Sequence, residues 1–223
     1  MGYVETLIGD VNLELSTGKL IALIGDNGSG KSTLMKTLLG LIKPLRGDIF
    51  FNQKNIQEFS AKEWSGVFSA VFSRLGQIPE IRVRELIDIG SNNKNSELKN
   101  DIVNWLNIAD LLHEFATQIS DGQLQKVMIA RALMQDTPFV IFDEPTAHLD
   151  YKNKSIVFDL LRNLVKVSGK TFIVITHEIL HALHLSDEIW YIHNRKLYHG
   201  TPESLENRFS FEKEILKFTH DRS

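Results

Sequence analysis

The chain contains no cysteine among its 223 residues. Disulfides, thiolate metal sites, iron–sulfur clusters and a cysteine nucleophile are therefore excluded, and the absence fits a reducing compartment. An excess of charge of one sign is also missing, because 25 basic residues face 28 acidic ones and the formal net charge is −3. The chain lacks the broad positive field that non-specific nucleic-acid binding needs, so no nucleic-acid partner is expected.

Long hydrophobic runs are absent as well. The longest are three short blocks, Leu20–Ile24, Phe139–Phe142 and Phe172–Ile175, whereas a membrane-spanning helix needs about 20 apolar residues. The first seven residues have neither a basic segment nor an apolar core, so no secretory signal is expected. We therefore expect a soluble, intracellular protein that reaches a membrane only through a partner.

The three apolar blocks organise the chain. Each is followed by a polar or glycine-rich loop and then by a helix-like stretch, which predicts an α/β fold with a parallel sheet buried on both faces. Segments 3–24 and 47–53 look like short strands of an antiparallel edge. Residues 82–135 lack long β-branched runs and look helical. The simplest organisation is an α/β core interrupted by a helical insert, with ligands at the carboxyl ends of the strands.

The segment from Gly25 to Ser32, Gly-Asp-Asn-Gly-Ser-Gly-Lys-Ser, fits the phosphate-loop pattern G-x-x-x-x-G-K-[ST]. Glycines let successive backbone N–H groups face one anion, and the helix that follows adds its positive dipole end. Lys31 is placed to reach the β- and γ-phosphates, and the Ser32 hydroxyl is placed to ligate Mg²⁺. The alternative is an ordinary glycine-rich turn.

A second element follows another apolar block. Phe139–Phe142 leads directly into Asp143 and Glu144. Beside a phosphate loop, Asp143 would hold the magnesium ion through water, and Glu144 would act as the general base on the attacking water. Alone the pair is a weak signal, because many buried strands end in acidic residues.

Further motifs occur in a fixed order along the chain. Ile119–Gln123 (Ile-Ser-Asp-Gly-Gln) resembles the signature sequence of ATP-binding cassette (ABC) ATPases, whose usual form is LSGGQ, and the helix-like stretch from Gln125 resembles the helix that follows it. Glu144–Asp150 resembles the D-loop of that family, and Thr176-His177 resembles its switch histidine. The chain is identified by these ordered motifs as resembling ABC ATPases from Tyr3 to about Tyr198.

The resemblance implies a P-loop NTPase core with a RecA-like parallel sheet and an antiparallel edge, at 1–73 and 136–223, with the signature-bearing helical insert at 74–135. It also implies ATP and Mg²⁺ as cofactors, with Glu144 and His177 as catalytic residues. In the family two chains sandwich the nucleotides, so each chain holds half of two sites. The implied nucleotide contacts are Tyr3, Gly25, Asp26, Asn27, Gly28, Ser29, Gly30, Lys31, Ser32, Thr33, Ser120, Gly122, Gln123 and Asp150, and the implied metal ligands are Ser32, Asp143 and Ser73.

Two positions depart from the family pattern. The glutamine that normally ends the strand near Val71 is missing, and Ser73 or Gln77 would replace it. Asp121 stands where the signature has its second-last glycine, and its carboxylate is expected to point away from the phosphates. Tyr3 lies where the family places the aromatic that stacks on the base; a terminal tyrosine without that role is the alternative.

One segment invites a different interpretation. His177-Glu178-Ile-Leu-His181 matches the zinc motif H-E-x-x-H. That chemistry needs both histidines inside one helix, whereas His177 is expected at a strand end, with His181 and His184 on a helix surface. A GTPase would need an N-K-x-D guanine motif, and Asn153–Ile156 lacks its aspartate. A monomeric small-molecule kinase would leave the signature unexplained.

Within the family, segments such as Val83–Gly90 and Ser186–Trp190 look most like ATPases of iron–siderophore, haem and cobalamin importers, with other metal importers as close competitors. That resemblance implies a homodimer on the cytoplasmic face of the inner membrane, bound to a multi-span permease and indirectly to a substrate-binding protein. Ser73–Glu80, with Leu75 and Ile78, is expected to contact a cytoplasmic helix of the permease. The alternative is a soluble ABC ATPase acting on DNA or ribosomes.

Overall fold

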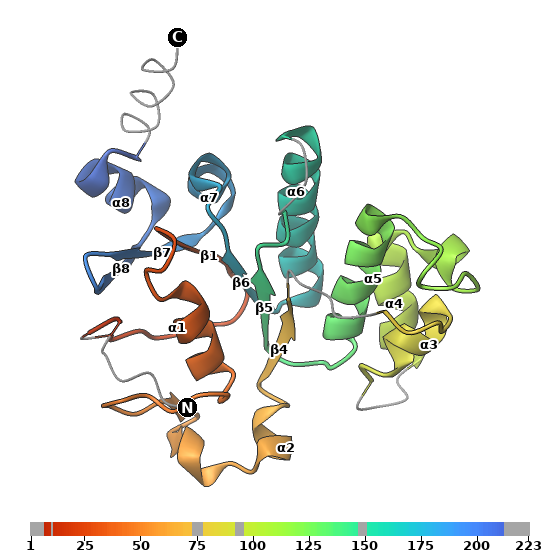
Figure 1. The fold of residues 1–223 in the computed structure, drawn as a ribbon, viewed down its shortest axis with the longest axis horizontal. Coiled ribbons are helices and arrows are strands. Elements are labelled where there is room, and N and C mark those ends of the chain that lie inside the picture. Colours follow the sequence, from red (N-terminus) through yellow and green to blue (C-terminus); the bar gives the residue numbers. More distant parts are fainter. Residues whose placement is uncertain (1–6, 10, 73–77, 92–95, 147–150, 212–223) are drawn as a thin grey trace.

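The computed structural model describes residues 7–9, 11–72, 78–91, 96–146 and 151–211 (Figure 1). At its centre lies a six-stranded sheet in the order β4-β5-β6-β1-β7-β8. Its strands are β1 (Leu20–Gly25), β4 (Phe68–Val71), β5 (Phe139–Asp143), β6 (Thr171–Ile175), β7 (Glu188–His193) and β8 (Lys196–Gly200), while β2 (Phe50–Phe51) and β3 (Lys54–Asn55) form a separate antiparallel pair. All neighbours in the main sheet are parallel except β7 and β8. The expected α/β class with a mostly parallel sheet and an antiparallel edge is confirmed.

The antiparallel edge is not where the sequence predicted it. We expected its strands in 3–24 and 47–53, but the second segment contributes only β2, outside the main sheet. Ahead of β1, the described residues form a single bridge, between Gly9 and Lys196. The edge of the main sheet is instead the β7–β8 hairpin, which was not predicted because β8 has only two adjacent apolar residues, Leu197 and Tyr198.

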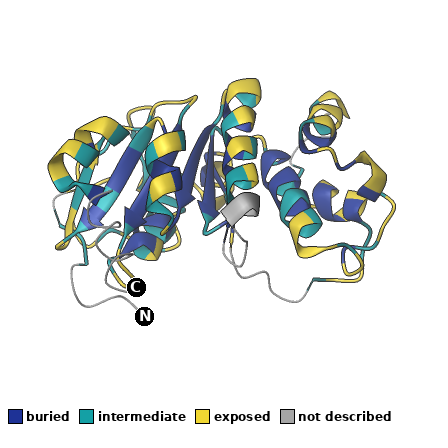
Figure 2. Ribbon diagram, turned by 90° about the horizontal axis from the view of Figure 1, so that it is seen from above, coloured by how far each residue is buried: buried dark blue, intermediate teal, exposed yellow. Residues whose placement is uncertain are grey.

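Helices cover both faces of the sheet, and their outward surfaces are exposed while the strands between them are buried (Figure 2). They are α1 (Lys31–Leu38), α2 (Ala61–Trp64), α3 (Val83–Asp88), α4 (Ser96–Leu106), α5 (Asp121–Leu133), α6 (Tyr151–Ser168), α7 (Ile179–Leu185) and α8 (Pro202–Phe209), with short 3₁₀ helices at Ile56–Glu58 and Ala109–Leu111. None of the helices in the described ranges combines the length and apolar character needed to traverse a bilayer.

The continuous apolar blocks are explained by burial on both faces. In β5, Ile141 packs in a cluster with Met35 of α1, and its neighbour Phe142 packs in another with Phe158 of α6. All four side chains are at most 2 % exposed. Burying one such side chain stabilises the fold by about 1.5–3 kcal/mol. A strand with apolar contacts on alternate sides therefore reads as an unbroken apolar run.

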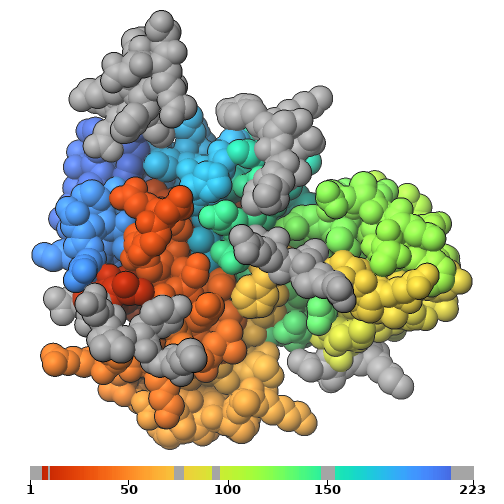
Figure 3. Space-filling model, viewed as in Figure 1, coloured from red at the N-terminus to blue at the C-terminus, as the bar shows by residue number. Residues whose placement is uncertain are grey.

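Helices α3, α4 and α5 form a lobe beside the edge strand β4 (Figures 1 and 3). Their apolar side chains, including Ile87, Ile102 and Val127, belong to the same cluster as Val71 of β4. Gly90, which follows the C-cap of α3, lies so close to α5 that a Cβ there would be 2.2 Å from the Arg131 carbonyl oxygen. The lobe is thus packed onto the sheet edge.

Candidate nucleotide site

Three loops meet because the strands before them are neighbours. Strand β6 lies between β1 and β5, and Ile175 is in register with both Leu23 and Asp143. The carboxyl ends of parallel strands share one edge of a sheet, which is where ligands of open α/β sheets bind. The phosphate loop after β1, Glu144 after β5 and His177 after β6 are therefore brought together.

The phosphate loop, residues 25–33, follows β1 directly and runs into α1. Gly30 is the residue before α1 and has a left-handed backbone with φ 109°, a conformation that side chains strongly disfavour. At Gly25 a Cβ would lie only 2.7 Å from the Ile192 carbonyl oxygen. The loop thus depends on glycine both for its curl and for its close approach to β7.

Lys31 is 7 % exposed, and its ammonium donates hydrogen bonds to the carbonyls of Gly25, at 2.6 Å, and Asp26, at 2.9 Å. Burial lowers the pKa of this ammonium, while the nearby carboxylates of Glu144, Asp26 and Asp143 act in the opposite direction. The cation is held inside the loop, with its charge directed to the region that an anion would occupy.

The two carboxylates differ in their surroundings. Asp143 is the last residue of β5, and burial, followed by the Glu144 carboxylate, raises its pKa, while Lys31 and Lys36 oppose that rise. Glu144 leaves the strand with φ 50°, and its N–H donates to the Ile175 carbonyl at 2.9 Å. A non-glycine residue in this backbone region is strained, as is often found at functional sites.

A cavity of about 310 Å³ joins the loops. Its lining comes from the phosphate loop, the ends of β5 and β6, and the segment before β1: Leu7, Asn27, Gly28, Gly30, Lys31, Ser32, Thr33, Asp143, Glu144 and Ile175. The cavity combines a cation, hydroxyl groups, backbone N–H donors and two carboxylates. This combination suits a polyphosphate with a divalent cation.

His177 lies two residues beyond β6, and its Nδ1 is 3.6 Å from Glu144 Oε1. Helix α7 begins only at Ile179, so His177 and His181 are not one turn apart in a helix, as a zinc motif would require. Within the described residues, no group of three or more His, Asp or Glu side chains is arranged to hold a metal ion. The prediction for His181 was wrong, however, because that side chain is buried rather than on the helix surface; His184 is exposed.

The signature residues lie on the helical lobe. Ser120 is the N-cap of α5, accepts the Gln123 N–H at 3.3 Å, and donates its own N–H to Gln123 Oε1 at 2.9 Å. Asp121 and Gly122 in the first turn are exposed. The structure does not bring these residues into the cavity of the same chain. Tyr3, Ser73, Gln77 and Asp150 lie outside the described residues.

Two polar residues near the site were missed by the sequence analysis. Glu178 lies 3.3 Å from His177 Nε2 through its Oε1 atom, and the Lys154 ammonium donates to the same oxygen. Glu178 was visible only as part of the supposed zinc motif. Lys154 comes from α6, more than twenty residues earlier in the chain, so no local pattern could connect it with the histidine.

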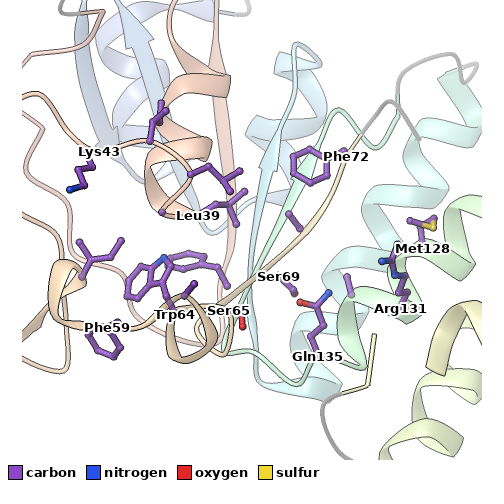
Figure 4. A pocket seen from close by; sticks show the side chains of 18 of the residues that line it. Leu39, Lys43, Phe59, Trp64, Ser65, Ser69, Phe72, Met128, Arg131 and Gln135 are labelled. Carbon is purple, nitrogen blue, oxygen red and sulfur yellow. The ribbon is translucent and has the colours of Figure 1, made fainter. Parts of the chain in front are cut away.

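A larger groove of about 910 Å³ lies between the sheet and the lobe (Figure 4). Figure 4 shows Trp64 and Phe59 on one side, Met128 and Arg131 of the lobe on the other, and Phe72 after β4 between them. Phe72 is 40 % exposed, and the Arg131 Nε atom is buried without a hydrogen-bond partner. Apolar surface and an arginine with one unpaired nitrogen therefore occur together in this groove.

Comparison with known proteins agrees with this geometry. Residues 8–147 match the family model described as ABC transporter. The achromobactin transport ATP-binding protein of Dickeya dadantii is 33 % identical over 218 residues, covering 92 % of this chain and 81 % of that protein. The zinc import ATP-binding protein of Wigglesworthia glossinidia brevipalpis is 29 % identical over 207 residues, covering 93 % and 85 %.

Among solved structures, cbiO1 from Clostridium perfringens, part of the ABC transporter complex cbiONQ, matches with a TM-score of 0.82 and 27 % identity. The match covers 97 % of this chain and 88 % of that one. The chain therefore belongs to the ABC transporter family, and it is an ATP-binding ATPase.

Proposed function

We propose that this ATPase is the energy-supplying subunit of a bacterial ABC importer, working as a homodimer against a separate multi-span permease on the cytoplasmic face of the inner membrane. The observation that carries the proposal is the placement of the motifs. The phosphate loop, Asp143–Glu144 and His177 meet at the carboxyl ends of neighbouring parallel strands, while the signature lies at the start of α5 on the lobe. Each of these two surfaces would carry half of a nucleotide site, so two chains facing each other would together form two complete sites.

The phosphate loop binds the β- and γ-phosphates of ATP in this proposal. Backbone N–H groups of residues 25–33 and the start of α1 provide the cradle. Lys31 exchanges its bonds to the Gly25 and Asp26 carbonyls for phosphate oxygens. The remaining proposed nucleotide contacts come from Tyr3 on the base and, across the dimer, from Ser120, Gly122, Gln123 and Asp150.

Glu144 is proposed as the general base, because it lines the same cavity as Lys31 and its carboxylate lies beside His177. It takes a proton from the water that attacks the γ-phosphate. His177 is proposed to contact the γ-phosphate and so to hold it in line with that water. Both roles require the two side chains to be next to the terminal phosphate. Their positions just beyond the ends of the neighbouring strands β5 and β6 support this.

The donor set fits Mg²⁺. The Ser32 hydroxyl and the Asp143 carboxylate line one cavity, and both are hard oxygen ligands. The raised pKa of Asp143, caused by burial and by Glu144, indicates unrelieved negative charge that a divalent cation would offset. Ser73 is proposed as a third ligand. When bound, the ion neutralises phosphate charge.

The groove between sheet and lobe is proposed to hold a cytoplasmic helix of the permease. Its apolar lining and the partly buried Arg131, whose Nε atom has no hydrogen-bond partner, suit a helix with an apolar face and an acidic side chain. Ile78, from the segment Ser73–Glu80 that the sequence analysis singled out, lines this groove. We propose the boundaries 1–73 and 136–223 for the core and 74–135 for the lobe, so the groove lies at their junction.

Iron–siderophore, haem or cobalamin is proposed as the transported solute. The likeness to a protein named for achromobactin transport supports a siderophore, while the likeness to a zinc import protein shows that similar ATPases are named for other solutes. The solute is expected to pass through the permease without touching this chain.

Crosslinking to the permease tests the proposal. Single cysteines are introduced at Leu41 and Ile78, which line the groove, and no native cysteine needs to be removed. The matched control is Val167→Cys on α6, where the side chain is 54 % exposed and outside the groove. Crosslinks from the two groove positions and none from the control are expected. The opposite pattern would mean that the permease docks on another surface. Co-purification of nucleic acid with no membrane protein would favour a soluble ABC ATPase acting on DNA or ribosomes.

A further inference from the structure

Arg131 is the one charged side chain in a buried stretch of helix α5. Of the eight residues from Val127 to Met134, it alone is partly exposed, and the other seven are buried. Its guanidinium lies in the groove between the sheet and the lobe, near Met128 (Figure 4). A guanidinium stays protonated in proteins, so this wall of the groove carries a fixed positive charge.

The stem of Arg131 is held against the end of α3. A Cβ at Gly90 would lie 2.9 Å from Arg131 Cγ and 2.2 Å from its carbonyl oxygen. A side chain at position 90 would therefore push Arg131 away, and glycine lets the two segments touch. The contact leaves the guanidinium on the groove side of the lobe, where Figure 4 shows it.

The groove offers this cation no counter-ion of its own. Its described lining contains two cations, Lys43 and Arg131, and no aspartate or glutamate. The Arg131 Nε atom is buried and has no hydrogen-bond partner, although a buried donor without an acceptor is unfavourable. Gln135, just beyond the end of α5, lines the same wall. A carboxylate is the acceptor that matches the planar guanidinium, and the Gln135 amide is a further donor on that wall.

Helix α5 joins this groove to the signature. Ser120 caps its first turn, and Arg131 lies eleven residues further along the chain, about 16 Å along the helix axis. Between them, Val127 and Ile129 are fully buried in the same cluster as Val71 of β4. A close-packed helix transmits strain along its length, so a displacement at its C-terminal end reaches its N-terminal end.

We propose that Arg131 binds a carboxylate of the permease's cytoplasmic helix and thereby anchors α5, which sets the position of the signature at the other end of that helix. Arg131 is then a positioning residue. The inference rests on the proposed docking in the groove, and it adds the contact through which the permease acts on hydrolysis. The route along α5 is independent of the glutamine that the family pattern places near Val71 and that this sequence lacks there. Lys43 is exposed on the sheet side of the groove, so it attracts an acidic helix without fixing it.

ATP hydrolysis by the complex with the permease provides the first test. The permease used is the one that crosslinks at Leu41 and Ile78, and stimulation is the ratio of the rates with and without it. Arg131→Met has a similar length without the charge, so it should weaken permease binding about tenfold and reduce stimulation about fivefold or more. Arg131→Lys keeps the charge but not the planar fork, and its effect should be intermediate.

The matched control is Lys126→Met, which removes a partly exposed cation from the same helix outside the groove lining. It should keep parental binding and stimulation. The Tm of each variant without the permease checks that α5 is still folded. A loss in Lys126→Met equal to that in Arg131→Met would overturn the specific role of Arg131.

A double-mutant cycle identifies the carboxylate. Each Asp and Glu of the permease's cytoplasmic helix is replaced in turn by Asn or Gln. At one position the loss of binding should not add to that of Arg131→Met, and Arg131→Glu combined with a lysine at that position should recover part of the affinity. Additive losses at every position, or parental binding by Arg131→Met, would overturn the anchor.

A disulfide between Ile78→Cys and the permease keeps the helix docked and isolates the effect along α5. In this linked complex Arg131→Met should still reduce stimulation, and full stimulation would overturn the connection to the signature. If neither Leu41→Cys nor Ile78→Cys crosslinks to a permease, the docking and the anchor both fail. If both crosslink and Arg131→Met behaves as the parent, the docking stands and only the role of Arg131 is wrong.

Discussion

At the scale of single residues, the site concentrates charge that a nucleotide and its metal would balance. Lys31 is a buried cation whose pKa is lowered by burial, and Asp143 is a carboxyl whose pKa is raised by burial and by Glu144. Both shifts oppose the charged form that the proposed chemistry uses. Groups with such perturbed pKa values in one cavity are typical of functional sites rather than of stable surface pairs.

Replacing Glu144 by Gln tests the proposed base. Gln has nearly the same shape but cannot accept the proton, so kcat should fall by about 10²–10⁴. ATP binding should be retained, since the lost negative charge reduces repulsion of the phosphates. The measurements are phosphate release and equilibrium binding of ATP. The matched control, Glu203→Gln in the exposed first turn of α8, should be unaffected, and parental turnover in Glu144→Gln would refute the assignment.

Replacing Asp143 by Asn should abolish hydrolysis but stabilise the nucleotide-free fold at neutral pH. The folded-state pKa is raised above the ordinary value of 3.8. The folded protein therefore binds protons more tightly than the unfolded chain, and it loses this contribution to stability as pH rises through the folded-state pKa. The neutral Asn escapes that loss, so its Tm without Mg²⁺ should be roughly 1–4 °C above the parent.

The Tm difference should vanish on acidification, where the parental carboxyl is also neutral. Thermal unfolding across pH checks the sign, and Asp159→Asn, an exposed carboxylate on α6, should show no such gain. A lower Tm for Asp143→Asn at neutral pH would mean that its carboxylate stabilises the fold and that the charge argument is wrong.

The sequence predicts those parts of the site whose residues lie close together along the chain. The phosphate loop and the Asp143–Glu144 pair were predicted because each follows an apolar block directly. The burial of His181 was missed because its ring stacks on Phe158, at 5.3 Å between centroids, and its Nε2 lies 3.0 Å from the Ser155 hydroxyl. Both partners lie on α6, and no local pattern indicates which face of α6 meets α7.

At the scale of secondary-structure elements, the sequence indicates the three strands that form the continuous apolar blocks singled out above, and it misses a strand of mixed character at the edge of the sheet. Strands β1, β5 and β6 coincide with the three apolar blocks. Strand β8, Lys-Leu-Tyr-His-Gly, has only exposed or partly buried residues. Its pairing with β7 is determined by the hairpin register rather than by hydrophobicity.

Helix α5 offers a test that separates capping from nucleotide binding. Ser120 caps the helix, so Ser120→Ala should cost about 1 kcal/mol of folding stability. Asp caps about as well as Ser, so Ser120→Asp should keep the parental Tm. In the proposed dimer its carboxylate would face the phosphates, however, and should lower ATP hydrolysis about tenfold or more. If Ser120→Asp hydrolyses ATP at the parental rate, the signature is only a helix cap.

At the scale of the whole molecule, the two halves of the proposed site lie on different lobes. The cavity at the sheet edge contains none of Ser120, Gly122 or Gln123 among its described lining residues. The sequence could predict both motifs but not their separation, because that depends on how α3, α4 and α5 pack beside β4. Such separation favours a site completed by a second copy of the chain.

Mixing two impaired variants tests whether the halves act between chains. Lys31→Ala damages only the phosphate-loop half, because it removes the buried cation of the cavity, and Ser120→Asp damages only the signature half. A mixed dimer would contain one site with both defects and one intact site. ATP hydrolysis should therefore rise on mixing above the low rate of either variant alone. The matched control mixes Lys31→Ala with Glu144→Gln, whose defects lie in the same half, and should stay inactive. If the first mixture shows no such rise while the two variants exchange chains, the signature does not complete the partner's site.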